Sequence, residues 1–549
     1  MVGWALAAGV PLAFLGFFFG WPAAALVARG FTTDGAPDLS GFAEVFSRPR
    51  TWRIVGQTLA QATLGTVISL ALGIPGAYVL YRRRFRGRGA VRAFVTVPFV
   101  LPTVVVGVAF RSLLVEGGPL AGLRLDGTMT AVVAALVFFN YAVVVRTVGG
   151  LWERLDPRAE QAARALGAPP WRAFTGVTLP ALLPAIASAG SLVFLFCATA
   201  FGTVLVLGGP RLGTVETEIW VQTTQFLDLR TASVLSVVQL VIVAGALAVA
   251  GRARARGERA LHLAGADRST PLRWRTAGRG DRGAAVLTAG VVVLLALPLA
   301  TLVARSLRTP DGWGLANYAN LGTVGDGLAV TVWQAAGNSL RAAVDATVLA
   351  LVVGGLVALV VSRRPRSRSG RRAVRGLDAV FMLPLGVSAV TVGFGILITL
   401  DRPLGLPVDL RTSGLLVPVA QAVVAVPLVV RTVLPVLRAV DPRLREAASA
   451  LGAAPGRVLA AVDLPIAARA VGLAVGFAFA VALGEFGATS FLARPDAPTL
   501  PVVIFRLIGR PGADSSGMAL AASVVLATMT AGVVALAERL RGPGTGGLL

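Results

Sequence analysis

The sequence predicts an all-α polytopic membrane protein with about 12 transmembrane helices, arranged as two parallel units of six helices. Of its 549 residues, 55% are hydrophobic and 14% are charged, and the mean hydropathy of +0.77 is too high for an ordinary soluble domain. Continuously apolar runs recur along the chain, each long enough to cross a hydrocarbon core of roughly 30 Å as a helix. An internal repeat divides these runs into two sets of six.

The predicted spans are separated by short polar connections. In the first unit we expect spans near residues 2–27, 54–81, 92–114, 128–150, 180–206 and 230–250. In the second unit we expect spans near residues 284–304, 330–361, 377–400, 414–437, 466–492 and 517–537. The first span is predicted to be retained, because no basic n-region and no cleavage site mark it as a signal peptide. We therefore assign residues 1–250 and 284–549 to the two units and residues 251–283 to a basic cytoplasmic linker.

The formal net charge of +24 comes from arginine, since the sequence contains no lysine. The arginines gather in short loops such as 82–88 and 363–375, which predicts that these loops stay in the cytoplasm. This distribution argues against nucleic-acid binding as the reason for the charge. Without lysine the chain cannot form the P-loop that binds the phosphates of ATP.

Cysteine and histidine are equally scarce. Cys197 and His262 are the only ones of their kind, which excludes Cys/His zinc clusters and Cys–His nucleophilic pairs. We expect a chain that is not an enzyme and that itself binds no cofactor and no metal.

The internal repeat is clearest in two polar segments, 156–180 and 441–465, which align without a gap at a spacing of 285 residues. An even number of spans in each unit makes the repeats parallel, so both segments should lie on the side of the arginine clusters. Further pairs extend the match: Val-Arg-Thr-Val at 145–148 and 430–433, Phe-Gly at 201–202 and 486–487, and Gly-Gln-Thr-Leu at 56–59 with Gly-Asn-Ser-Leu at 337–340.

Each polar segment predicts a short helix, a turn and a second short helix. Asp156 and Asp441 are suited to cap the first helix, because a carboxylate accepts hydrogen bonds from free backbone N–H groups at the positive helix end. Proline follows each aspartate at the first helical position, where a missing N–H costs nothing. Gly167 and Gly452 can then adopt the left-handed conformation that closes the helix.

The two segments resemble the EAA loop of ABC-importer permeases, whose pattern is Glu-Ala-Ala, then a glycine and then Leu-Pro. The first segment departs from the pattern, because it carries Gln161 where the glutamate is expected and has Glu160 one position early. In that family the loop is a coupling helix that docks on an ATPase subunit, and the alternative is an ordinary amphipathic loop helix. The residues at the positions of this pattern are Gln161, Ala162, Ala163 and Gly167 in the first segment and Glu446, Ala447, Ala448 and Gly452 in the second.

The resemblance implies the permease of a type I ABC importer. Two cytoplasmic ABC ATPase subunits would dock on the two loops and carry the ATP and magnesium, and an extracytoplasmic solute-binding protein would deliver solute at the opposite side. The chain would be a multi-pass protein of the bacterial cell membrane with both coupling loops in the cytoplasm. The alternatives are an ion-coupled secondary transporter, which would place several ionisable groups at the membrane midplane, and a membrane enzyme.

Two six-span units in one chain resemble the fused permeases of thiamine and iron(III) importers. The stretches at 81–85, 201–209 and 484–487 favour the thiamine branch. Permeases of that branch usually have an aspartate where Glu485 stands here. Thiamine is therefore the leading solute, and iron(III) or another charged solute is the alternative.

Polar groups inside the predicted spans are candidates for the translocation path, because a charge within a bilayer is costly unless it has a function. We select Glu485 in the eleventh span, Asp345 in the eighth and Asn140 in the fourth. Glu485 would attract a cationic solute, and its alternative role is a hydrogen bond between helices; Asn140 would also suit an interhelical contact. The segment between the fifth and sixth spans, which includes Glu216 and Glu218, is predicted to lie outside the membrane.

Overall fold

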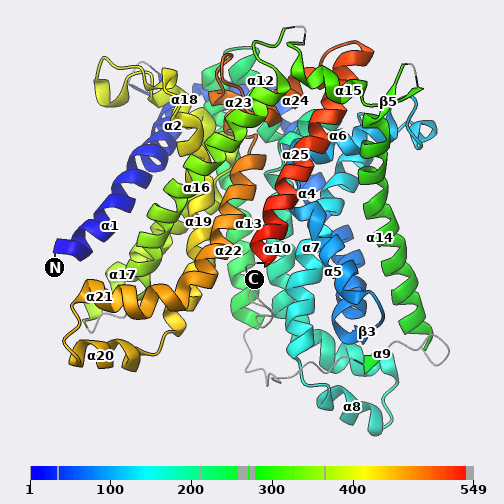
Figure 1. The fold of residues 1–549 in the computed structure, drawn as a ribbon, viewed down its shortest axis with the longest axis vertical. Helices are drawn as coiled ribbons and strands as arrows, with labels where there is room; N and C mark the ends of the chain where they lie inside the picture. The colour runs from blue at the N-terminus through cyan, green and yellow to red at the C-terminus, as the bar shows by residue number, and fades with distance from the viewer. Residues whose placement is uncertain are drawn as a thin grey trace.

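The computed structural model describes residues 2–33, 36–209, 212–257, 270–271, 278–310, 312–325, 327–363 and 367–539. Most of the predicted linker 251–283, with His262, lies outside these described residues. The described chain is a bundle of long helices capped at each end by shorter ones (Figure 1).

The helices of the first unit are α1 (Val2–Leu15), α2 (Trp21–Phe31), α3 (Ser40–Ser47), α4 (Pro49–Ala77), α5 (Arg88–Val100), α6 (Thr103–Leu114), α7 (Met129–Arg154), α8 (Arg158–Ala165), α9 (Pro170–Ala173), α10 (Leu179–Ala198), α11 (Gly202–Leu207), α12 (Val215–Thr224) and α13 (Leu229–Gly257). Those of the second unit are α14 (Arg279–Ser306), α15 (Ala316–Ala319), α16 (Val332–Ser362), α17 (Arg368–Met382), α18 (Ala389–Thr399), α19 (Leu416–Ala439), α20 (Pro442–Ala450), α21 (Pro455–Val458), α22 (Leu464–Gly484), α23 (Thr489–Leu492), α24 (Leu500–Ile508) and α25 (Ala513–Arg539).

The described residues also contain three pairs of two-residue strands. Two pairs are antiparallel hairpins, β1 (Thr32–Thr33) with β2 (Ala36–Pro37) and β5 (Arg308–Thr309) with β6 (Gly312–Trp313). The third pair is parallel and joins β3 (Arg83–Arg84) to β4 (Thr270–Pro271).

Within the described residues, 10 helical segments are long and apolar enough to cross a membrane. They correspond to ten of the twelve predicted spans, which confirms the all-α polytopic fold. The π-helical turns η4 (Phe174–Thr178) and η9 (Leu459–Asp463) continue smoothly into α10 and α22, so each of these spans begins earlier than the sequence predicts. The duplication is therefore preserved even in an irregular helical turn.

The third and ninth predicted spans are not continuous helices, and this expectation was wrong. α5 and α6 meet at an angle of 103°. At the break Leu101 has an extended backbone with ψ of 140°, because a residue before proline is pushed out of the helical region. Pro102 also lacks the N–H that a continuous helix would use. A second Leu-Pro pair, Leu383-Pro384, separates α17 from α18 in the other unit.

The two units interlock through their first spans. α1 packs against α16 of the second unit, and α2 packs against α18. In the reciprocal position, α14 packs against α4 and α6 of the first unit. In Figure 1, α1 and α2 stand beside the second-unit helices at one flank, and α14 stands beside the first-unit helices at the other. Each first span therefore ties one unit to its partner unit.

The fifth and eleventh spans end earlier than predicted. α10 stops at Ala198 and α22 at Gly484, and short helices follow instead of a continued span. After α10 the chain forms α11 and α12, and after α22 it forms α23 and α24. These short helices lie at the end of the bundle opposite α8 and α20 (Figure 1).

Candidate coupling loops and path residues

The two predicted coupling helices, α8 and α20, lie at the same end of the molecule (Figure 1). Each is preceded by an aspartate that caps its first turn. Asp156 Oδ1 accepts a hydrogen bond of 3.0 Å from the Arg158 N–H, and Asp441 Oδ1 accepts one of 2.9 Å from the Arg443 N–H. Asp441 is the N-cap residue, as predicted, whereas α8 begins one residue later, at Arg158.

A left-handed glycine closes each helix, which confirms the conformation predicted from the sequence. Gly167 has a φ of +89° and Gly452 a φ of +83°. The N–H of the next residue then turns back to the carbonyl of an EAA-like alanine, at 3.1 Å in the first loop and 3.0 Å in the second. These carbonyls belong to Ala163 and Ala448, so the third residue of each motif is a closing acceptor of its helix.

Equivalent positions tie each coupling helix to the span that follows it. In the first loop the Thr178 hydroxyl donates a 2.7 Å hydrogen bond to Glu160 Oε2. Glu160 therefore points back toward the bundle instead of outward.

In the second loop the same two positions hold Arg445 and Asp463, whose ion pair spans 2.7 Å. Asp463 is fully buried and also pairs with Arg363 at 3.0 Å. The first loop uses a hydroxyl–carboxylate hydrogen bond and the second an ion pair, but both contacts join the coupling helix to the following span at equivalent positions. A rigid connection from loop to span is therefore a duplicated feature of this fold.

The outward surface of each loop is formed by the remaining motif residues. Gln161, Ala162, Glu446 and Ala447 are exposed, and Ala163 and Ala448 are half-buried. The most prominent apolar groups are Leu166 and Leu451, the residues just before the closing glycines, each 89% exposed. Sequence reasoning missed them, although an apolar residue repeated at the same place in both polar segments was a visible signal.

Glu485 does not present a free carboxylate. Its side chain is 7% exposed, lies just after the end of α22 and caps α23. Oε1 accepts a hydrogen bond of 2.7 Å from the Ala488 N–H, and Oε2 accepts one of 3.0 Å from the Thr489 N–H. This geometry supports the structural alternative, a carboxylate that satisfies backbone donors.

The other two candidates lie in different surroundings. Asn140 is buried on α7, where Nδ2 donates to Leu136 O at 2.9 Å and contacts Cys197 Sγ of α10 at 3.4 Å. It therefore holds two helices together. Asp345 is exposed on α16 between the exposed side chains of Val344 and Val348. The structure does not bring the three candidates into one site.

The segment that the sequence predicts outside the membrane carries a carboxyl that is buried within the protein, which the sequence did not indicate. Glu216 on α12 has no exposed surface. The hydroxyl of Ser388, at the start of α18 in the other unit, donates to its Oε2 at 2.9 Å. Burial raises the pKa of the Glu216 carboxyl to about 8, and the Ser388 hydroxyl and the Gln239 amide beside it offset only part of this rise.

A second duplicated motif proves to be an anchor for α12 and α24. The Val215 N–H donates to Thr58 Oγ1 at 3.0 Å, and the Leu500 N–H donates to Ser339 Oγ at 2.7 Å. Thr58 and Ser339 are the third residues of the two Gly-Gln/Asn-Thr/Ser-Leu stretches. Because the first N–H groups of a helix have no partner within that helix, these hydroxyls fix where each short helix begins.

Comparison with known proteins agrees with the duplicated architecture. Residues 65–254 match the family described as "Binding-protein-dependent transport system inner membrane component". The chain is 28% identical to the thiamine transport system permease protein ThiP of Escherichia coli (strain K12), over 83% of this chain and 84% of that protein. It is also 28% identical to ThiP of Brucella abortus (strain 2308), over 97% of this chain and 95% of that protein.

A further relative and a solved structure also resemble parts of the chain. The sulfate transport system permease protein CysT of Escherichia coli (strain K12) is 31% identical over 38% of this chain and 76% of that protein. A bacterial ABC transporter involved in the import of the polysaccharide alginate aligns with 44% of this chain and 92% of its own, at 18% identity and a TM-score of 0.39. The chain therefore belongs to the binding-protein-dependent ABC-importer permeases, as two permease units fused in one polypeptide.

Proposed function

We propose that this chain is the permease subunit of an ATP-driven importer that moves thiamine across the bacterial cell membrane. The observation that carries the ATP-driven mechanism is the pair of exposed, glycine-closed helices α8 and α20 at one end of the bundle. The solute assignment is supported by the two thiamine transport permeases that match this chain over most of its length. The end that bears α8 and α20 is then the cytoplasmic end.

Two ATPase subunits dock on these helices, one on each, and hold the ATP and magnesium. When ATP draws the ATPases together, each coupling helix moves with its docked subunit. The contacts Glu160–Thr178 and Arg445–Asp463 pass that movement to α10 and α22. A solute-binding protein delivers thiamine at the opposite end, where the short helices α12 and α24 lie. The permease contributes the gated passage.

The test is uptake into lipid vesicles that contain the permease with its ATPase subunits, with the solute-binding protein added outside. Radiolabelled thiamine, ferric ion and sulfate are compared with and without ATP inside the vesicles. We expect uptake of thiamine that requires ATP and the binding protein. Uptake of ferric ion or sulfate in place of thiamine would overturn the solute assignment. Full uptake without ATP, driven by an ion gradient, would instead indicate a secondary transporter.

A further inference from the structure

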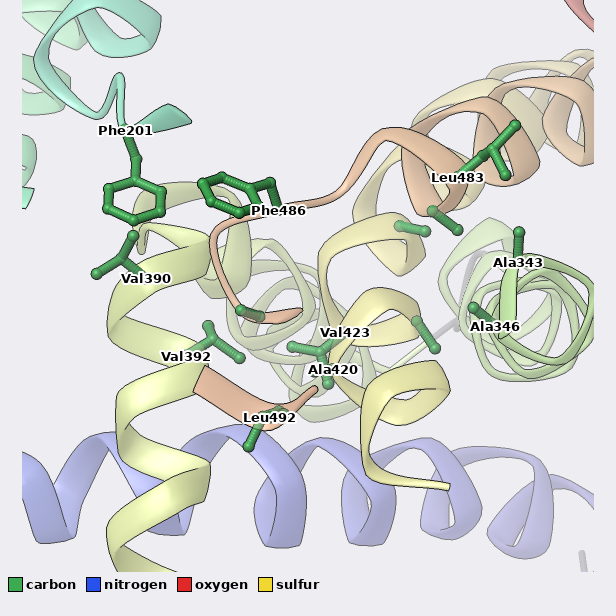
Figure 2. Close-up of a cluster of buried hydrophobic side chains, with 14 of the residues drawn as sticks. Phe201, Ala343, Ala346, Val390, Val392, Ala420, Val423, Leu483, Phe486 and Leu492 are labelled. Carbon is green, nitrogen blue, oxygen red and sulfur yellow. The ribbon is translucent and has the colours of Figure 1, made fainter. Parts of the chain in front are cut away.

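The two units meet at a pair of equivalent phenylalanines. Phe201 and Phe486 come from the duplicated Phe-Gly motif, and their rings stack with centroids 5.4 Å apart at an interplanar angle of 19°. Figure 2 shows the two rings next to each other on segments of different units. Gly202 keeps this region free, because a Cβ at that position would lie 2.6 Å from Thr103 Oγ1 and 3.1 Å from the Phe486 ring.

A second equivalent pair completes a cluster of four rings. Trp220 of α12 and Phe505 of α24 are separated by the repeat spacing of 285 residues, and they pack edge to face with centroids 5.7 Å apart. Trp220 also lies 6.4 Å from Phe201, and Phe505 lies 5.4 Å from Phe486. The cluster joins the units at the end of the bundle where α12 and α24 lie (Figure 1).

The surroundings of the cluster are asymmetric, because α12 carries Glu216 where α24 carries Pro501. Glu216 lies four residues before Trp220, so the two side chains share one face of α12 one turn apart. This acidic group belongs to the first unit alone.

Several polar atoms near Glu216 are buried without a hydrogen-bond partner among the described residues. They are Glu216 Oε1, Trp220 Nε1 and Gln239 Oε1. Gln239 gives its own hydrogen bond to Ala198 O at 3.1 Å. Buried polar groups in native proteins are nearly always paired, so a cluster of unpaired ones beside aromatic rings calls for an explanation. A ligand that pairs with them in another conformation supplies one.

We propose that Glu216 and Trp220, with the phenylalanine rings of this cluster, form a contact site for a cationic aromatic solute on its way through the permease. The inference rests on the proposed import mechanism and names the residues that would recognise its solute. When the site opens to water the Glu216 carboxyl can ionise, and the carboxylate then attracts the positive charge. Trp and Phe rings attract a cationic ring through their π faces. Trp220 Nε1 and Gln239 Oε1 add one donor and one acceptor. Thiamine, with a cationic thiazolium ring and a pyrimidine ring, has this chemistry.

In the proposed mechanism the same cluster closes the passage, because it joins the two units at this end of the bundle. The Phe201–Phe486 contact and the Trp220–Phe505 contact both cross from one unit to the other. When the units separate at this end, both contacts open and the face of α12 with Glu216 and Trp220 becomes accessible. Closing the cluster again would exclude the solute from this end and release it toward the coupling-loop end.

The test compares Glu216→Gln with Glu218→Gln in the vesicle uptake assay. Gln at position 216 keeps an acceptor for Ser388 but cannot ionise when the site opens to water. Glu218 is a matched control on the same helix, because it is occupied by a two-bond ion pair with Arg50 at 3.0 and 2.8 Å. We expect Glu216→Gln to lower kcat/KM for thiamine about tenfold or more, mainly through KM, while Glu218→Gln stays near the wild type. Co-purification of the ATPase subunits checks that both variants are folded.

Substitutions of Trp220 provide an independent test of the site. Trp220→Leu should lower kcat/KM for thiamine about tenfold, and Trp220→Phe, which restores a ring, should recover a substantial part. Wild-type kinetics in Glu216→Gln would overturn the site, and so would an equal loss in Glu216→Gln and Glu218→Gln. If the wild-type permease transports another solute and not thiamine, the proposed function fails at that point, before the variants are compared.

Discussion

Replacing Leu451 by alanine should weaken the docking of an ATPase subunit without weakening the fold. Leu451 is 89% exposed at the tip of α20, so the free permease gains little from its side chain. If docking buries the side chain, Leu451→Ala removes three carbons from the interface. At about 0.8 kcal/mol for each buried methylene, the loss is about 2 kcal/mol, or roughly a 30-fold rise in Kd. Leu166→Ala should have the same effect at the first loop.

The assay is titration of the purified permease in lipid nanodiscs with its ATPase subunit, followed by light scattering or surface binding. Leu315→Ala is the control, because Leu315 is 67% exposed and lies near α15 at the opposite end of the bundle. The double variant Leu166→Ala/Leu451→Ala should add the two losses, since in the proposed mechanism each loop binds its own subunit. Unchanged Kd values in both single variants would refute docking through these leucines.

Three further substitutions test the connections inside the permease. Gly452→Ala should strain the coupling loop by about 1 kcal/mol, because φ is +83° at that position, and lower ATP-stimulated uptake; the control Gly456→Ala has no such φ and should be neutral. Asp463→Asn should destabilise the protein by about 3 kcal/mol, because Arg445 loses its buried charged partner. Thermal unfolding measures this, and an unchanged melting temperature would contradict it. Ser339→Ala should cost about 2 kcal/mol by leaving a buried N–H of α24 unpaired, with faster amide exchange there as the readout; slow exchange in the variant would count against the anchor.

Periodicity and duplication were enough to predict much of this protein. Long apolar runs must become helices in a bilayer, because a membrane interior offers no other partner for backbone N–H and C=O groups. The left-handed closures at Gly167 and Gly452 were also predictable, since a glycine between a short helix and a proline has few other uses. These features depend on residues near one another in the chain.

The breaks in the helices were harder to predict. A proline inside an apolar run is compatible with a straight span, a kink or a turn, and the choice depends on which neighbours satisfy the freed backbone. At Pro102 the chain turns by 103°, and in the second unit α17 ends at Met382, just before Leu383-Pro384. The residues of one apolar segment do not reveal which helices will pack against it, and those helices decide whether its proline produces a kink or a turn.

Polar residues show the same division. From the sequence, Glu485 was the leading path residue and Glu216 was part of an external segment. In the fold, the Glu485 carboxylate accepts hydrogen bonds from backbone N–H groups at the start of α23. Glu216 is buried against Ser388 of the second unit, beside an aromatic cluster. The sequence by itself determined that this is a duplicated helical permease with a closed loop in each unit. Only the tertiary structure decided which acidic side chain is left with an unpaired oxygen, because that depends on partners hundreds of residues away.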